Sequence, residues 1–191
     1  MKRPKKASYK PITEARLQEL ALRYVGRYAA TEAMLRRNLL NHVKRAERLQ
    51  KESTASSSDV SKWISAIVQS AVKKGYVNDQ TYAESVTRVA QKSGWSKRKI
   101  SQKLMQKGIG RDMLAHTMEQ GADDMRAALI FARRRSLGPY RKVEEADKEL
   151  RTKEMEKLCR AGFSPEMARK IVRLSPDQLE EMEDELRTKY A

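Results

Sequence analysis

The side chains of this sequence that are suited to chemistry are mostly cationic and lie at helical spacing. Lys99, Lys103 and Lys107 follow one another at intervals of four residues, which places three ammonium groups on one side of a predicted helix. Like charges at this spacing cost a helix roughly 0.2–0.5 kcal/mol per pair, and an opposing polyanion would offset that cost. A solvated face would explain one such stripe, but several stripes favour phosphate contact. The remaining bases that we predict to contact phosphates are Arg36, Arg37, Lys44, Arg45, Arg48, Lys97, Arg98, Arg133, Arg134, Arg135, Arg141 and Lys142.

Residue patterns for catalysis or metal binding do not occur in the sequence. His42 and His116 have no partner at metal-ligand spacing, and the Gly-Ile-Gly at 108–110 lacks the further glycines of a dinucleotide-binding loop. The paired acids are explained by solvated helix faces. Cys159 occupies an apolar helical position, which predicts a buried thiol. We therefore expect a protein that is not an enzyme, with no catalytic residue, no metal and no cofactor.

The overall charge points to a polyanionic partner. The 191 residues carry a net charge of +16, with 39% hydrophobic and 35% charged residues. Residues 1–120 hold 25 Lys and Arg against 10 Asp and Glu, whereas residues 121–191 hold 16 against 15. Such an excess fits nucleic acid or an anionic membrane surface. No apolar run approaches membrane-spanning length and no secretory signal is recognisable, so we expect a cytoplasmic protein without a membrane partner.

The chain is organised around a helix-turn-helix stretch that recurs. Ser96 is suited to cap a helix in which Ile100 and Leu104 share the apolar face, and Gly108 is suited to end it. Trp95, before the cap, is predicted to form a hydrophobic staple with residues one turn on. Residues 103–109 match residues 157–163, and Thr31, Leu35 and Leu39 repeat the spacing of the first copy. A unit too small to bury its own apolar face must stack on its neighbours.

Helical periodicity runs through the whole chain, and prolines and glycines fall at the expected helix ends. Thr13 and Asp79 are predicted to cap helices, and a helix is expected over 143–161. We predict an all-α protein. The expected parts are a basic flexible tail over 1–11, a first three-helix repeat over 12–75 with an inserted linker near 51–58, a second repeat over 76–121, a third over 122–174, and an acidic helix over 175–191.

Several of these segments resemble one known family. The segments are residues 31–39, 75–83, 94–109, 132–141 and 160–164, and their order and spacing are similar to those of the RecX regulatory proteins over roughly residues 13–174. The resemblance implies tandem three-helix repeats in an elongated, curved array. It also implies a monomer that binds the RecA recombinase filament and single- and double-stranded DNA, contacts them through the bases above, and modulates, chiefly inhibits, recombination, repair and SOS signalling.

Two other functions compete with this interpretation. Residues 100–118 have the outline of a helix-turn-helix transcription regulator, whose second helix would present Arg111, Asp112, His116 and Glu119. Two acids on that helix, and the repetition of the unit, argue against a sequence-specific reader. A nucleic-acid-processing enzyme is the third candidate, and the lack of clustered acids or histidines argues against it.

Overall fold

The computed structural model describes residues 11–49, 56–142 and 147–190, and within them all regular structure is helical. The expected all-α fold is confirmed. Most of the predicted basic tail and of the predicted linker lies outside the described residues. The chain divides into two compact units, which we describe separately: unit 1 runs to Tyr82 and includes Lys107–Ile109, and unit 2 holds Ala83–Gln106 and everything from Gly110 onwards.

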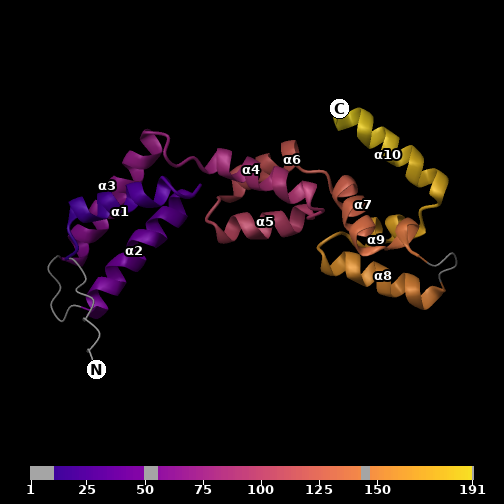
Figure 1. Cartoon of the computed structure of the whole chain (residues 1–191), viewed down its shortest axis with the longest axis horizontal. Coiled ribbons are helices and arrows are strands. Elements are labelled where there is room, and N and C mark those ends of the chain that lie inside the picture. Colours follow the sequence, from indigo (N-terminus) through magenta and orange to yellow (C-terminus); the bar gives the residue numbers. More distant parts are fainter. Residues whose placement is uncertain (1–10, 50–55, 143–146, 191) are drawn as a thin grey trace, which may run out of the picture. The chain divides into compact units, whose positions relative to one another are not determined.

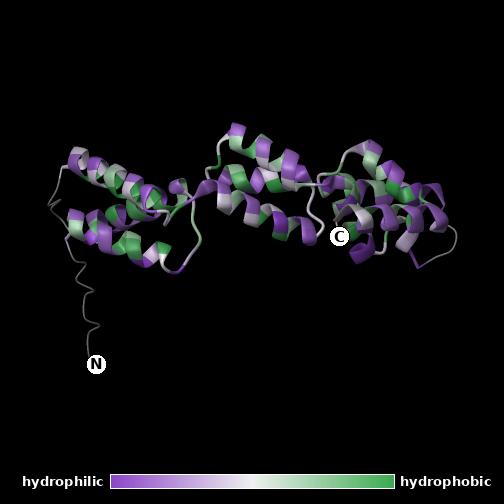
Figure 2. Cartoon of the chain, turned by 90° about the horizontal axis from the view of Figure 1, so that it is seen from above, coloured by the Kyte–Doolittle hydropathy of each residue, from purple (hydrophilic) through white to green (hydrophobic). Residues whose placement is uncertain are grey.

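Unit 1 contains three helices that pack on one another (Figure 1): α1 (Glu14–Val25), α2 (Glu32–Leu49) and α3 (Ser57–Lys73). Each helix has one apolar face, which Figure 2 shows as green residues alternating with purple ones along the ribbon. The faces meet in a core in which Leu17, Leu35 and Leu39 have no exposed surface. Burying an aliphatic side chain of this size stabilises the fold by about 1.5–3 kcal/mol, so these positions fix the packing of the three helices.

Unit 2 contains the remaining helices: most of α4 (Asp79–Lys92), then α5 (Lys97–Gln106), α6 (Arg111–Gly121), α7 (Asp124–Arg135), the 3-10 helix η1 (Gly138–Tyr140), α8 (Lys148–Arg160), α9 (Pro165–Arg173) and α10 (Pro176–Tyr190). Helices α5 and α6 pack together, and α7, α8 and α9 surround a second core. Leu137, Leu158 and Ile171 are almost completely buried there.

In unit 1, the start of α2 is held by partners far along the chain. Thr31 is fully buried, and its hydroxyl accepts from the backbone N–H of Met34 while donating to the carbonyl of Lys107. The next backbone N–H, that of Glu32, donates to the carboxylate of Asp79 at 2.9 Å. The first turn of a helix has four N–H groups without helical partners, and these bonds satisfy two of them.

In unit 2, the start of α5 is held in the same way. The buried Ser96 hydroxyl accepts from the N–H of Lys99 and donates to the carbonyl of Ala161 at 2.8 Å, and the N–H of Lys97 donates to Asp124 at 2.6 Å. The two sets of bonds correspond residue by residue. The repeat seen in the sequence is therefore also a repeated joint, in which one hydroxyl caps its own helix and donates to a backbone carbonyl 65 or 76 residues further along the chain.

A glycine follows the accepting carbonyl in both joints. Gly108 and Gly162 have φ values of 90° and 95°, a left-handed conformation that other residues rarely adopt. A Cβ on Gly108 would lie 2.1 Å from the Cβ of Ala33, and one on Gly162 would lie 2.5 Å from the Ser96 Oγ. The glycines are thus needed both for the turn and for the close approach to the capped helix.

Some local predictions are wrong. Asn78, rather than Asp79, caps α4 by accepting from the N–H of Thr81, because the Asp79 carboxylate is used at the start of α2. Helix α3 already begins at Ser57, inside the stretch predicted as a linker. Helix α8 begins at Lys148, where Asp147 supplies the cap, and residues 143–146 lie outside the described residues. The Cys159 thiol is half-buried rather than buried.

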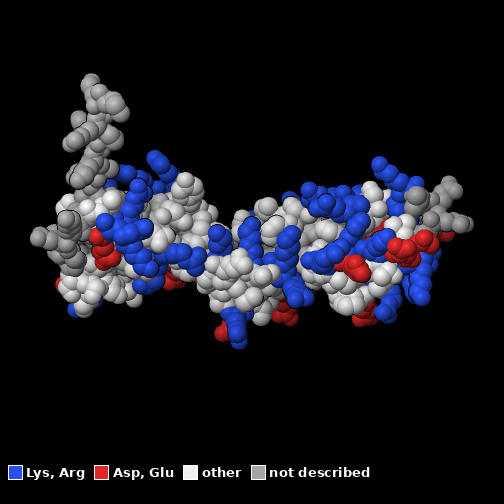
Figure 3. Space-filling model, turned by 90° about the horizontal axis from the view of Figure 1, so that it is seen from below, with Lys and Arg blue, Asp and Glu red and all other residues white. Residues whose placement is uncertain are grey.

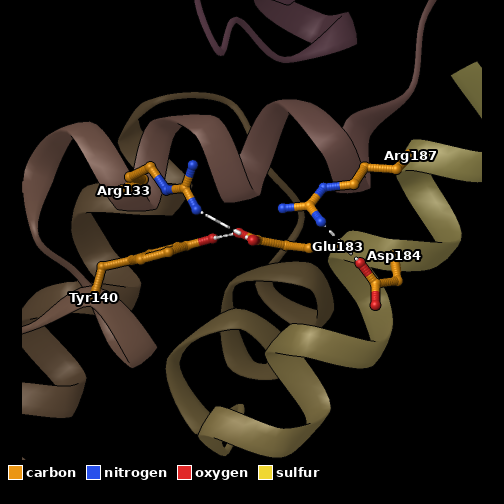
Figure 4. Close-up of polar contacts among 5 residues, drawn as sticks. All are labelled: Arg133, Tyr140, Glu183, Asp184 and Arg187. Carbon is orange, nitrogen blue, oxygen red and sulfur yellow. Dashed lines mark hydrogen bonds and ion pairs between the residues drawn. The ribbon is translucent and has the colours of Figure 1, made fainter. Parts of the chain in front are cut away.

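The acidic helix α10 is fixed to unit 2 by both apolar and polar contacts. Leu179, Met182 and Leu186 pack against the second core. The Glu183 carboxylate accepts from the Tyr140 hydroxyl and pairs with Arg133 at 2.8 Å, as Figure 4 shows. Burial, followed by the hydrogen bond and the charge of Glu183, raises the pKa of Tyr140, and Arg133 opposes this shift.

The joint in unit 2 can be tested with two serine substitutions. Ser96→Ala removes the cap of α5 and leaves the carbonyl of Ala161 without its donor, whereas Ser164→Ala removes only an exposed cap, that of α9. We expect Ser164→Ala to cost about 0.5–2 kcal/mol of stability and Ser96→Ala to cost about 1–3 kcal/mol more. Urea denaturation followed by the loss of helicity measures the free energy of unfolding of both variants. Equal losses would show that the bond to Ala161 stabilises nothing.

Tyr140 should resist ionisation at alkaline pH. The pKa of Tyr140 in the folded chain lies above its value in the unfolded chain. The contact with Glu183 therefore contributes its full stabilisation of the fold below a pH of about 10, and that contribution is lost as the pH rises through the folded-state pKa. Tyrosinate absorbance should therefore rise equally in the wild type and in Tyr140→Phe through the ordinary tyrosine range. A smaller rise in the variant there, with helicity intact, would contradict the Glu183 contact.

Candidate nucleic-acid interface

The bases predicted on α2 lie on its exposed side. The buried residues of α2 form the opposite side, which faces the core of unit 1. Arg36 donates to the Ser65 hydroxyl of α3 at 3.1 Å, but Arg37, Lys44 and Arg48 are exposed and have no carboxylate within ion-pair distance among the described residues. The exposed α2 bases predicted from the sequence are Arg36, Arg37, Lys44, Arg45 and Arg48.

Helix α1 adds two bases that sequence reasoning missed. Arg16 and Arg23 bind the two oxygens of the Glu19 carboxylate at 2.5 and 2.7 Å, and both lie near enough to His42 of α2 to affect its titration. Burial, then Arg16, Arg45 and Arg23, lowers the pKa of His42. The seven-residue spacing of the two arginines on α1 was the available signal. The positive surface of unit 1 therefore extends from α2 to α1.

The lysines of α5 lie beside an aromatic ring. The Lys99 and Lys103 ammonium groups lie 4.1 and 4.8 Å from the centre of the Trp95 ring. Trp95 thus lies beside two cations of α5, and the hydrophobic staple predicted for it stays a prediction. Arg98 is exposed and Lys97 is half-buried. Lys107 follows the end of α5 at Gln106 and is half-buried, so the predicted helical stripe ends with Lys103.

The arginines at the end of α7 are exposed, but two of them have partners. Arg133 pairs with Glu183, and Arg134 donates to the carbonyl of Ser93 at 3.0 Å. Arg135 and Lys142 are exposed.

Arg141 lies in a different setting from the other predicted bases. Its side chain is 14% exposed and binds the carboxylate of Glu154, itself 3% exposed, at 2.7 Å, and it also donates to the carbonyl of Val172. A buried carboxylate needs this partner, since an uncompensated buried charge costs several kcal/mol. Arg141 is therefore committed to the core of unit 2, and we leave it out of the candidate interface.

In both units, the face shown in Figure 3 carries more Lys and Arg than Asp and Glu. We call the exposed bases of α2, α5 and α7 the basic faces; they are Arg36, Arg37, Lys44, Arg45 and Arg48 on α2, Arg98, Lys99 and Lys103 on α5, and Arg133, Arg134 and Arg135 on α7. Exposed guanidinium and ammonium groups of this kind bind phosphate oxygens without reading base sequence.

Across the part of the chain that the structure describes, no three His, Cys, Asp or Glu side chains gather as metal ligands, and no helix is long and apolar enough to cross a membrane.

The known proteins found to be similar to this chain are RecX proteins. The family model for the second three-helix domain of RecX matches residues 78–118. A regulatory protein RecX from Myxococcus xanthus is 34% identical over 178 residues, which cover 92% of this chain and 91% of that protein. A regulatory protein RecX from Agrobacterium fabrum is 39% identical over 106 residues, which cover 56% of each chain.

Solved structures agree with the fold. The crystal structure of RecX from Lactobacillus salivarius has a TM-score of 0.63 at 18% identity, and covers 83% of this chain and 94% of its own. A second crystal structure of a regulatory protein RecX has a TM-score of 0.56 at 19% identity, and covers 83% of this chain and 70% of its own. The helical fold is that of these structures, and the match to the Myxococcus protein over nearly the full length decides the family: this chain belongs to the RecX family of regulatory proteins.

Proposed function

We propose that this protein binds the RecA recombinase filament on DNA and inhibits its activity, as a monomer and without catalysis of its own. Membership of a family of regulatory proteins supports a regulatory role. The observation that carries the DNA part of the proposal is the exposure of the basic faces on α2, α5 and α7. A filament that contains DNA presents closely spaced phosphates, and exposed Lys and Arg side chains bind phosphates.

The chemistry of the basic faces favours contact with phosphates over reading of bases. Exposed bases recur on helices of both units, so many weak contacts can act together without a fixed register on the DNA. A helix-turn-helix regulator would instead use α6, which follows the Gly108 turn. That helix exposes Asp112 and Glu119, and carboxylates repel the phosphates that flank a major groove. Binding to one fixed duplex site in a footprinting experiment would favour the regulator.

Charge reversal on α2 should weaken DNA binding without unfolding the protein. Arg37→Glu, Lys44→Glu and Arg48→Glu change three exposed side chains, and exposed substitutions shift stability by only about 0.5 kcal/mol each. Each phosphate contact contributes about −0.7 to the slope of log K against log salt for single strands, so losing three should flatten the slope by roughly 2. The matched control is the same reversal at Arg169, Lys170 and Arg173, exposed bases of α9 that are outside the basic faces.

The same two variants test the regulatory part of the proposal. Wild-type protein and the α9 control should slow ATP hydrolysis by RecA on single-stranded DNA, and the α2 variant should do so only at higher concentration. An equal flattening of the salt slope in both variants would show that net charge, rather than the α2 face, binds DNA. No slowing by the wild type at equimolar RecA would contradict the role in RecA regulation.

A further inference from the structure

A small hollow in unit 2 lies between the aromatic ring of Trp95 and the exposed side of α4. Its volume is about 250 Å³, and its lining is mostly apolar, with Val86 and Val89 contributed by α4. Val89 is 62% exposed, which is high for a valine within a helix. Lys103 lines the same hollow and also lies over the Trp95 ring. The hollow thus combines an indole ring, an apolar surface and a cation.

The two lysines at the ring have no anionic partner. Among the described residues, no carboxylate lies within ion-pair distance of Lys99 or Lys103. The two ammonium groups are four residues apart on α5 and repel each other, and the negative face of the indole ring offsets this repulsion. The ring therefore holds two positive charges that no acid of the described chain neutralises.

A second aromatic ring in unit 2 shows what such an arrangement looks like when it is complete. The Arg133 guanidinium lies 5.1 Å from the centre of the Tyr140 ring, and the Glu183 carboxylate binds both residues. At Trp95 the ring and the cations are present, and the anion is not. An anion from another molecule would complete the Trp95 cluster in the same way.

We propose that Trp95, Lys99 and Lys103 bind a nucleotide of single-stranded DNA, with the base stacked on the indole in the hollow and its flanking phosphates on the two ammonium groups. This inference rests on the proposed DNA-binding function and adds a site for an unpaired base. Lys103 moves from the ring to a phosphate, which uncovers the indole surface towards the hollow. A stacked base tightens binding by about 5- to 150-fold and is accepted whatever its identity. A paired base in a duplex cannot enter, since its faces are already stacked.

The test compares two strands of equal length and equal phosphate number, an oligothymidylate and an abasic strand of deoxyribose phosphate units. Wild-type protein should bind the oligothymidylate at least about fivefold more tightly, the ratio that corresponds to about 1 kcal/mol. Trp95→Ala should remove this preference while leaving the affinity for the abasic strand within about twofold. Trp95 fluorescence in a Trp63→Phe background should be quenched by the oligothymidylate and much less by the abasic strand.

A second variant keeps the test valid if Trp95→Ala is poorly folded. Val89→Gln places a longer, neutral side chain in the hollow at an exposed position, and it should also abolish the preference; Val72→Gln, at an exposed valine of α3 in unit 1, should not. Equal affinity of wild-type protein for the two strands would overturn the base site and leave phosphate binding intact. Absence of binding to either strand would overturn both this site and the DNA part of the proposed function.

Discussion

A buried hydroxyl that serves two helices is the interaction on which the rest of the structure depends. Thr31 and Ser96 each cap the start of one helix and donate to a backbone carbonyl far along the chain, next to a glycine in a left-handed conformation that other residues rarely adopt. Both hydroxyl-bearing residues are buried, so each joint is held to one geometry by the cost of leaving a buried hydroxyl unsatisfied. The capped helices, α2 and α5, are therefore fixed with their apolar sides inward and their bases exposed.

Local patterns were sufficient to predict the helices and their inward sides. The spacing of Ile100 and Leu104 predicted a shared apolar face, and both residues are completely buried. Ser96 was predicted as a cap because that role depends on neighbouring residues. Its second role could not be predicted, because the carbonyl of Ala161 lies 65 residues away. Asp79 was assigned to the wrong helix for the same reason, since its partner, the N–H of Glu32, is 47 residues distant.

The candidate interface was predictable in its charge but not in the partners of each base. Sequence spacing cannot distinguish Arg141, which neutralises the buried Glu154, from Arg135, which is exposed. It also could not show that Glu183 reaches Arg133, or that Lys99 lies over Trp95 instead of in open solvent. Partners of this kind depend on packing between helices. They separate Arg141, which stabilises the fold, from the exposed bases that remain accessible to a phosphate, among which Arg133 also holds α10.

The most direct test of the account is the chemical accessibility of individual lysines. Wild-type protein would be treated with an amine-modifying reagent, alone and with RecA-coated single-stranded DNA, and each lysine would be quantified by mass spectrometry. If the basic faces contact the filament, Lys44, Lys99 and Lys103 should be protected, while the exposed Lys73 and Lys170 on α3 and α9 should react as in the free protein. If all five lysines reacted as they do in the free protein, under conditions where the protein co-sediments with the filament, the proposed contact of the basic faces with the filament would be contradicted.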